Sequence, residues 1–220
     1  MEQSKIFISV GGTSNTEQET FVKAVEDRLT SENLLPNTVG RNKFSADAPL
    51  KAVKELMDEC SGLIVIALER TYYENGLESR GGNKEKVLQN IKYTTPWNQI
   101  EAGMAYVKGL PILVIIEDGI KIEGLLENGY DWYVLTVQPN QSSLSTKEFN
   151  GVLSSWKEKV EKYKEDKQRS IKINSLINPE ELTLGQIFRN LKASHLWSII
   201  LVLVAIATAG FLIGKFFSAM

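Results

Sequence analysis

The stretch YTTPWNQIEAGMAYVKGLPILVII, residues 93–116, carries a helix signal followed at once by a strand signal. Thr95 suits a helix N-cap and Pro96 suits the first helical turn, so we expect a helix near residues 96–109. The run PILVII, residues 111–116, is continuously apolar, which is typical of a strand buried on both faces of a sheet. The stretch therefore predicts one helix–strand unit of an α/β fold.

The same alternation continues on both sides of this unit. Further strands are expected at residues 5–10, 34–39, 63–68 and 131–137, the second of them at a sheet edge. Helices are expected at residues 16–33, with Thr16 and Glu19 as a capping box, and at 47–62, with Asp47 as N-cap. Strands that alternate with helices predict a parallel sheet covered on both faces. The expected strand order is 2-1-3-4-5, the flavodoxin-like arrangement.

In sheets of this order, ligands bind where the strand order reverses, at the carboxyl ends of the strands. Here that point lies between the first and third strands, beside residues 11–16 and 69–95. Residues 69–95 are polar and irregular, which is long for a connection in a compact domain, so a functional or a disordered loop is expected there.

Composition excludes several classes of protein. The formal net charge is −2, with none of the basic excess that nucleic-acid binding requires. The chain has one cysteine, Cys60, and one histidine, so a zinc site built from these residues is not expected and no metal ligands are assigned.

An uncharged apolar stretch, LWSIILVLVAIATAGFLIG, lies near the C-terminus at Leu196–Gly214. As a helix it would extend roughly 28 Å, about the thickness of a bilayer hydrocarbon core. Trp197 suits the lipid interface, and Arg189 and Lys192 outweigh Lys215. The sequence therefore predicts a single-pass tail anchor in the cell membrane with the large domain in the cytoplasm. A buried core helix is the alternative.

Three regions follow from this interpretation: an α/β domain over 1–168, a linker with a juxtamembrane amphipathic segment over 169–194, and a transmembrane helix over 195–217. The expected partners include the lipid bilayer. Gly210 and Gly214 form a GxxxG pair that allows close approach of two membrane helices, which predicts a homo-oligomer.

Glu101 is the candidate catalytic residue. Trp97, Ile100, Met104 and Val107 share one helical face, which we expect to be buried, with Glu101 at its edge beside the crevice. A carboxylate there can accept hydrogen bonds from a ribose or stabilise an oxocarbenium-like centre. The alternative is a half-exposed glutamate with no chemical role.

Nucleotide-binding residues are assigned around Glu101. Trp97 and Asn98 lie on the same helix, and the loop at Gly11, Gly12 and Thr13 offers backbone amides and a helix N-terminus to a phosphate. A plain turn is the alternative for this loop. Four loop aromatics are candidates for stacking on a base, with partial burial in the core as the alternative: Tyr72, Tyr73, Trp132 and Tyr133.

KIFISV at 5–10 and TPWNQIEAGMAYVKGLPILVII at 95–116 resemble the TIR-like superfamily, in which Ser or Thr, then Trp, then Glu open the helix before an apolar strand. The Glu101, Gly103 and Ala105 pattern is similar to the nucleoside 2-deoxyribosyltransferase-like group. The resemblance implies a flavodoxin-like fold and a glutamate that attacks or stabilises the sugar at an N-glycosidic bond. It also implies NAD or another nucleotide as ligand, and a role in bacterial antiphage defence.

Three functions remain open from the sequence. The first is a membrane-anchored domain that binds a nucleotide or NAD-like ligand as a sensor or effector. The second is an NAD or nucleoside N-glycosidase with Glu101 as the catalytic carboxylate. The third is a membrane-tethered interaction module without a ligand.

Overall fold

The computed structural model describes residues 3–176 together with residues 201 and 208. The chain divides into two compact units, Met1–Lys167 and Gln168–Met220. In the described part of the chain, no helix is long and apolar enough to cross a membrane. The predicted membrane helix at Leu196–Gly214, with its Gly210 and Gly214 pair, lies outside the described residues.

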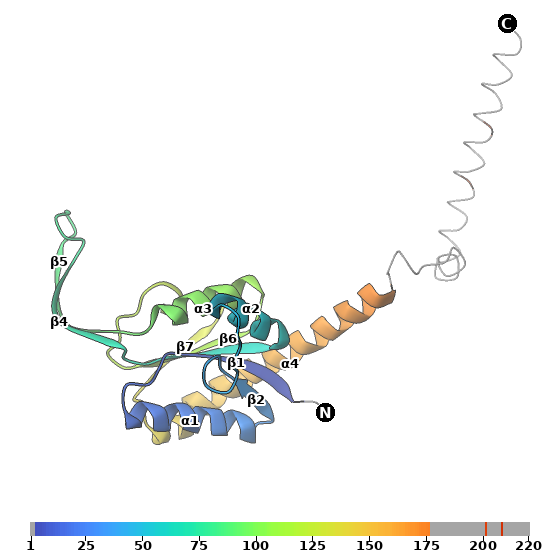
Figure 1. Cartoon of the computed structure of the whole chain (residues 1–220), viewed down its shortest axis with the longest axis horizontal. Coiled ribbons are helices and arrows are strands. Elements are labelled where there is room, and N and C mark those ends of the chain that lie inside the picture. The colour runs from blue at the N-terminus through green and yellow to red at the C-terminus, as the bar shows by residue number, and fades with distance from the viewer. Residues whose placement is uncertain (1–2, 177–200, 202–207, 209–220) are drawn as a thin grey trace, which may run out of the picture. The chain divides into compact units, whose positions relative to one another are not determined.

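A single parallel sheet organises residues 3–167 (Figure 1). Its strands are β1 (Ser4–Val10), β2 (Leu34–Asn37), β3 (Gly62–Ala67), β6 (Ile112–Glu117) and β7 (Tyr133–Val137). The order is β2-β1-β3-β6-β7, and every neighbouring pair is parallel. The predicted flavodoxin-like order is therefore confirmed.

Helices cover both faces of this sheet (Figure 1). The helices are α1 (Thr16–Ser31), α2 (Pro49–Glu59), α3 (Pro96–Val107) and α4 (Lys147–Leu176), with 3₁₀ turns η1 (Gly124–Leu126) and η2 (Gln141–Ser145). Alternate residues of β1 explain the two layers. Ile6 and Ile8 join the core under α1 and α4, and Phe7 joins the core under α2 and α3.

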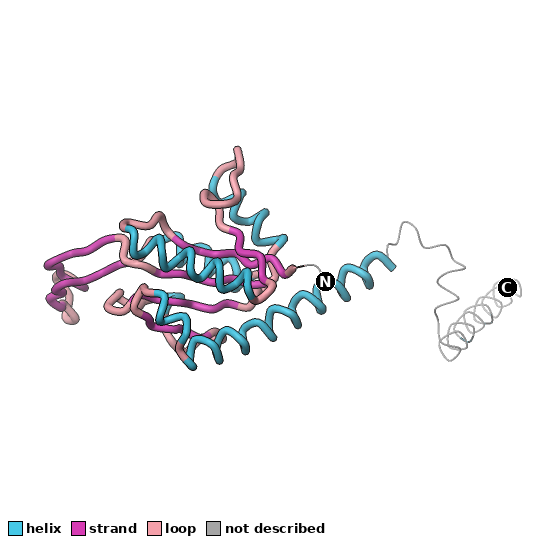
Figure 2. The backbone as a smooth tube through the Cα atoms, turned by 90° about the horizontal axis from the view of Figure 1, so that it is seen from below, coloured by secondary structure: helices cyan, strands magenta, loops and turns pink. Residues whose placement is uncertain are grey.

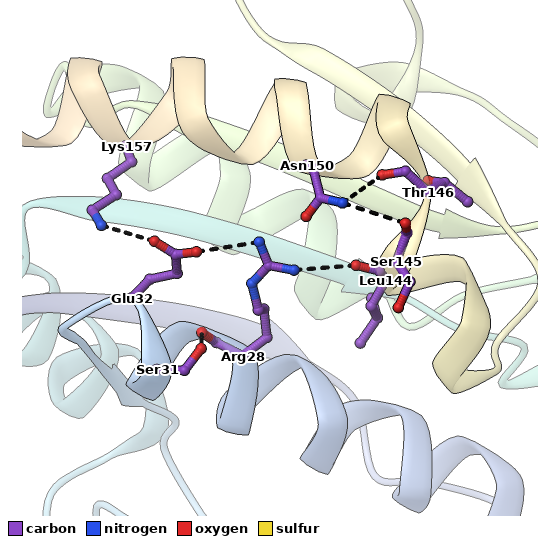
Figure 3. A network of polar contacts seen from close by, with 8 residues as sticks. All are labelled: Arg28, Ser31, Glu32, Leu144, Ser145, Thr146, Asn150 and Lys157. Atoms are coloured by element: carbon purple, nitrogen blue, oxygen red, sulfur yellow. Dashed lines mark hydrogen bonds and ion pairs between the residues drawn. The ribbon is translucent and has the colours of Figure 1, made fainter.

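A polar network ties α4 to the end of α1 (Figure 3). The Glu32 carboxylate accepts hydrogen bonds from Lys157 at 2.9 Å and from Arg28 at 3.2 Å, and Arg28 also donates to the Leu144 carbonyl at 3.2 Å. The bond from Lys157 is the main cause of the lowered pKa of Glu32. These contacts hold α4 beside α1.

Two predicted helix caps are wrong. The N-cap of α1 is Asn15, whose Oδ1 accepts a hydrogen bond from the Gln18 amide at 2.9 Å, so Thr16 is already inside the helix. The N-cap of α2 is Ala48, which makes no side-chain cap bond, while Asp47 pairs with Lys51. In both cases the observed N-cap lies one residue away from the predicted cap.

The expectation of an irregular connection over residues 69–95 is also wrong. Strands β4 (Thr71–Glu78) and β5 (Lys86–Tyr93) form an antiparallel hairpin with Thr71 opposite Tyr93 and Glu78 opposite Lys86. Both views show it leaving the sheet at the end opposite the start of β1 (Figures 1 and 2). Most hairpin residues are exposed, so the chain lacks the apolar alternation that would have marked these strands.

Candidate active site

Glu101 lies in the second turn of α3 on the face turned toward the sheet, and only 8% of it is exposed. Most of the expected apolar stripe of α3 is exposed instead: Trp97 is 38% exposed and Val107 is 87% exposed, while Met104 packs partly buried against the core. The buried face consists of Asn98, Glu101, Ala102 and Ala105. Small alanines allow the helix to approach β1 and β3 closely, which leaves the bulky side chains on the outside.

Asn98 connects the first turn of α3 to β1 and is fully buried. Its Nδ2 atom donates to the Ser9 carbonyl at 3.0 Å and to Ser9 Oγ at 2.9 Å. Its Oδ1 atom accepts a hydrogen bond from the Thr94 hydroxyl at 2.6 Å. With both ends of its amide bonded, Asn98 fixes the start of α3 against the carboxyl end of β1.

The Ser9 hydroxyl also interacts with the Glu101 carboxylate and favours its ionised form. Burial raises the pKa of Glu101 to about 7, and the interaction with Ser9 opposes part of that rise. A carboxyl group that titrates near neutral pH can act as a base, an acid or a carboxylate nucleophile under physiological conditions.

The predicted phosphate loop lies beside this network in a closed arrangement. The Gly12 carbonyl accepts a hydrogen bond from Arg70 at 3.1 Å, and the Thr13 hydroxyl donates to Glu19 at 2.7 Å. A Cβ atom on Gly11 would lie 3.0 Å from Thr95 Cγ2, so the loop needs glycine there to approach the start of α3. The hollow at this loop has a volume of about 10 Å³, which is too small for a phosphate.

A larger cavity of about 580 Å³ lies between the β4–β5 hairpin and the first turn of α3. Thr94 and Thr95 line both this cavity and the small hollow at the glycine loop. Of the four predicted stacking aromatics, only Tyr73 lines the large cavity. Glu101 lines neither space, and its link to the large cavity is the chain of contacts from Thr94 through Asn98 to Ser9.

The other candidate aromatics have different surroundings. Trp132 stacks on Tyr130 with ring centroids 4.8 Å apart, and Tyr133 donates a hydrogen bond to Glu148. The Tyr72 hydroxyl donates to Asn90 within the hairpin. The structure therefore does not bring these three residues together with Glu101 or the glycine loop.

Sequence reasoning missed Ser9 and Arg70. Ser9 lies between the apolar residues Ile8 and Val10 near the end of β1. An isolated polar residue in a buried strand needs a hydrogen-bond partner, so it could have indicated a polar site there. Arg70 follows β3 at the same sheet edge and reaches the Gly12 carbonyl. Its role depends on contact between segments 58 residues apart, which no local pattern reveals.

Cys60 is not a candidate nucleophile, because burial raises the pKa of its thiol to about 12. Within the described residues, no group of three or more His, Cys, Asp or Glu side chains is placed to hold a metal ion.

No protein-family model and no curated protein matches this chain. Among solved structures, it is similar to the CMP N-glycosidase BcmB of Clostridium botulinum, with 12% identity, a TM-score of 0.42 and coverage of 64% of this chain and 93% of that one. It is also similar to the Flv1 flavodiiron core of Synechocystis, with 14% identity, a TM-score of 0.40 and coverage of 73% of this chain and 36% of that one. TM-scores this low give no information about the function of this chain, which has to be inferred from the residues of the site.

Proposed function

We propose that the α/β domain binds a nucleotide at the carboxyl edge of its sheet and cleaves the N-glycosidic bond, with Glu101 as the catalytic carboxylate. One observation carries the proposal: a buried carboxyl group with a pKa of about 7, interacting with Ser9 at the end of β1 where the strand order reverses. NAD and nucleoside monophosphates are the substrates considered.

In this mechanism the bond between C1′ of the ribose and the base nitrogen breaks, and the base leaves with the electron pair. Ionised Glu101 stabilises the positive charge that develops at C1′, and a water molecule supplies the hydroxyl group to C1′. The proton of that water goes to the departing base of AMP or CMP, and to solvent when neutral nicotinamide leaves NAD. Ser9 favours the ionised carboxylate, and Asn98 fixes Ser9. Since Glu101 is 8% exposed, productive binding includes a shift of the segment formed by Thr94 and Thr95.

The test is whether the full-length chain releases free base from NAD, AMP or CMP. Liquid chromatography measures the released base. We expect Glu101→Gln to lower the rate at least about a hundredfold, because the amide carries no negative charge to place at C1′. Glu59→Gln is the matched control, since Glu59 pairs with Lys5 at the end of α2 and takes no part in the Ser9 network. Equal rates in the two variants would remove Glu101 from the mechanism.

A second candidate is a binding module without turnover, in which a TIR-like domain senses a nucleotide for antiphage defence. The burial of Glu101 and the closed hollow at Gly11 favour it, since both keep a sugar away from the carboxylate as it now lies. Nucleotide binding by calorimetry without release of base would support this candidate against the glycosidase. In both candidates the apolar stretch at 196–214 anchors the domain to the membrane and supports self-association.

A further inference from the structure

The β4–β5 hairpin is attached to the rest of the domain at two levels. At its base, the Lys92 carbonyl accepts a hydrogen bond from the Lys121 amide at 2.9 Å, and the Lys92 ammonium pairs with Glu69 and Glu117. Further along, Glu78 at the end of β4 pairs with the Lys121 ammonium at 2.6 Å. The hairpin is thus held over the segment that follows β6, and the cavity of about 580 Å³ lies beneath it.

The lining of this cavity combines aromatic and aliphatic side chains with polar ones. Tyr73 and Tyr93 meet edge to face with ring centroids 5.9 Å apart and planes at 81°. Leu88 and Ile91 from β5 and Leu126 from η1 add aliphatic surface. Tyr73 is 53% exposed, so part of its surface is free to meet a ligand. Small-molecule sites have this character and this range of volumes.

The charged residues at the rim of the cavity bear on whether it would take a phosphate or a neutral ring. Lys121 lies 5.6 Å from the centre of the Tyr93 ring, but its ammonium is already paired with Glu78 and with Glu123 at 3.2 Å. The Lys121 ammonium is thus already paired with two carboxylates and has little charge left for a phosphate. A neutral ring with hydrogen-bond donors does not need a free cation at this rim.

The position of the cavity links it to the proposed chemistry. Its wall includes Thr94, whose hydroxyl donates to Asn98, which in turn bonds to Ser9 and so reaches Glu101. A ring in the cavity is therefore separated from Glu101 by the thickness of this wall. A sugar attached to that ring would extend toward the Thr94 segment and the Glu101 network.

We propose that the cavity between the β4–β5 hairpin and the first turn of α3 binds a neutral planar heteroaromatic ring, the base of the nucleotide, against Tyr73. The assignment deepens the proposed function and rests on it for the identity of the ligand class. The hairpin then supplies base recognition, and the sheet edge supplies the carboxylate.

Calorimetric titration of the full-length chain with AMP, CMP and NAD tests this site, with ribose 5-phosphate as the base-free probe. We expect the nucleotides to bind more tightly than ribose 5-phosphate. Tyr73→Leu should weaken nucleotide binding about tenfold, since stacking of one base on one ring is worth that much, and should leave binding of ribose 5-phosphate unchanged. Tyr72→Leu is the matched control, because Tyr72 is the adjacent hairpin tyrosine and does not line the cavity.

A second variant, Leu88→Trp, fills the cavity from β5 and should abolish the preference for nucleotides over ribose 5-phosphate. Thermal melting by circular dichroism confirms that each variant is folded. Equal effects of Tyr73→Leu and Tyr72→Leu, an unchanged preference in Leu88→Trp, or no binding of any base-containing probe would each overturn the assignment. Occupation of the cavity by a second copy of the chain would also overturn the assignment. In that case light scattering would show the wild-type chain as a dimer and Leu88→Trp as a monomer.

These outcomes separate the two proposals. Base release that is lost in Glu101→Gln but unchanged in Tyr73→Leu and Leu88→Trp supports the glycosidase and overturns the base site. Nucleotide binding that requires Tyr73, without base release, supports the base site and overturns the glycosidase.

Discussion

The hydroxyl of Ser9, one residue before the end of β1, favours the ionised form of the Glu101 carboxylate on α3. The same hydroxyl oxygen accepts a hydrogen bond from Asn98 Nδ2 at 2.9 Å. Ser9 therefore joins the two polar residues on the buried face of α3 at the carboxyl end of a central strand. This relationship makes Glu101 a titratable group inside the domain and leads to the first two predictions.

Glu101 should make the stability of the domain depend on pH between about 4.5 and 7. Its pKa in the folded chain is about 7, above its ordinary value, so the fold favours the protonated form. The stabilisation is complete below pH 4.5 and is lost as pH rises through 7, a change of about 3 kcal/mol. We expect the free energy of unfolding of the wild-type chain to fall by this amount relative to Glu101→Gln, measured by urea unfolding from pH 4.5 to 8. Parallel curves for the two proteins would contradict it.

Ser9→Ala should raise the pKa of Glu101 further, because the hydroxyl that stabilises the carboxylate is lost. We expect a cost of about 1–2 kcal/mol in the free energy of unfolding, and an upward shift of the pH at which base release reaches half its maximum. Ser4→Ala is the control: Ser4 is buried on the same strand but donates to Glu161 at 3.1 Å. It should affect stability alone, and an identical pH profile for both variants would count against the Ser9–Glu101 interaction.

Gly62 is the point where α4 crosses the beginning of β3. A Cβ atom on Gly62 would lie 2.8 Å from Val160 Cγ2 and 2.9 Å from Trp156 Cζ2. We expect Gly62→Ala to lower the free energy of unfolding by about 1–3 kcal/mol through overpacking. In contrast, Gly151→Ala adds a methyl group with no atom within 4 Å, inside a helix, and should stabilise by about 0.5–1 kcal/mol. Urea unfolding of both variants measures the difference, and equal effects would mean that α4 does not rest on Gly62.

The apolar stretch at 196–214 should hold the full-length chain in membranes. We expect the chain to remain in the membrane pellet after extraction with alkaline carbonate, since about 19 apolar residues match a bilayer core. Deleting residues 196–214 should move the chain to the supernatant, and the Glu59→Gln variant, which keeps this stretch, should stay in the pellet. Release of the full-length chain by carbonate would contradict the anchor.

Much of the fold was predictable, because it depends on local patterns. The apolar runs LIVIAL and PILVII identify the central strands β3 and β6, since strands buried on both faces tolerate no polar alternation. The N-cap at Thr95 was predicted for a similar reason: its side chain bonds to a backbone amide two residues away. Alternation of helices and strands then left few possible topologies.

The hairpin and the orientation of α3 were not predictable in the same way. The hairpin is stabilised by pairing between residues up to 22 apart, such as Thr71 with Tyr93, on strands with little apolar alternation. For α3, helical periodicity placed Trp97 and Val107 inside, because both belong to an apolar stripe on one face. The available space favoured Ala102 and Ala105 instead, and with them Asn98 and Glu101 were buried.

The sequence by itself determined the strands of the parallel sheet, their order, the helices that cover it and Glu101 as the acidic residue near the start of α3, since each follows from residues close together in the chain. Only the tertiary structure decided that Glu101 is buried against Ser9, that the glycine loop is closed by Arg70, and that the hairpin forms a cavity beside Thr94. Burial and pairing between distant segments set these features, and neither is encoded in any local stretch of residues.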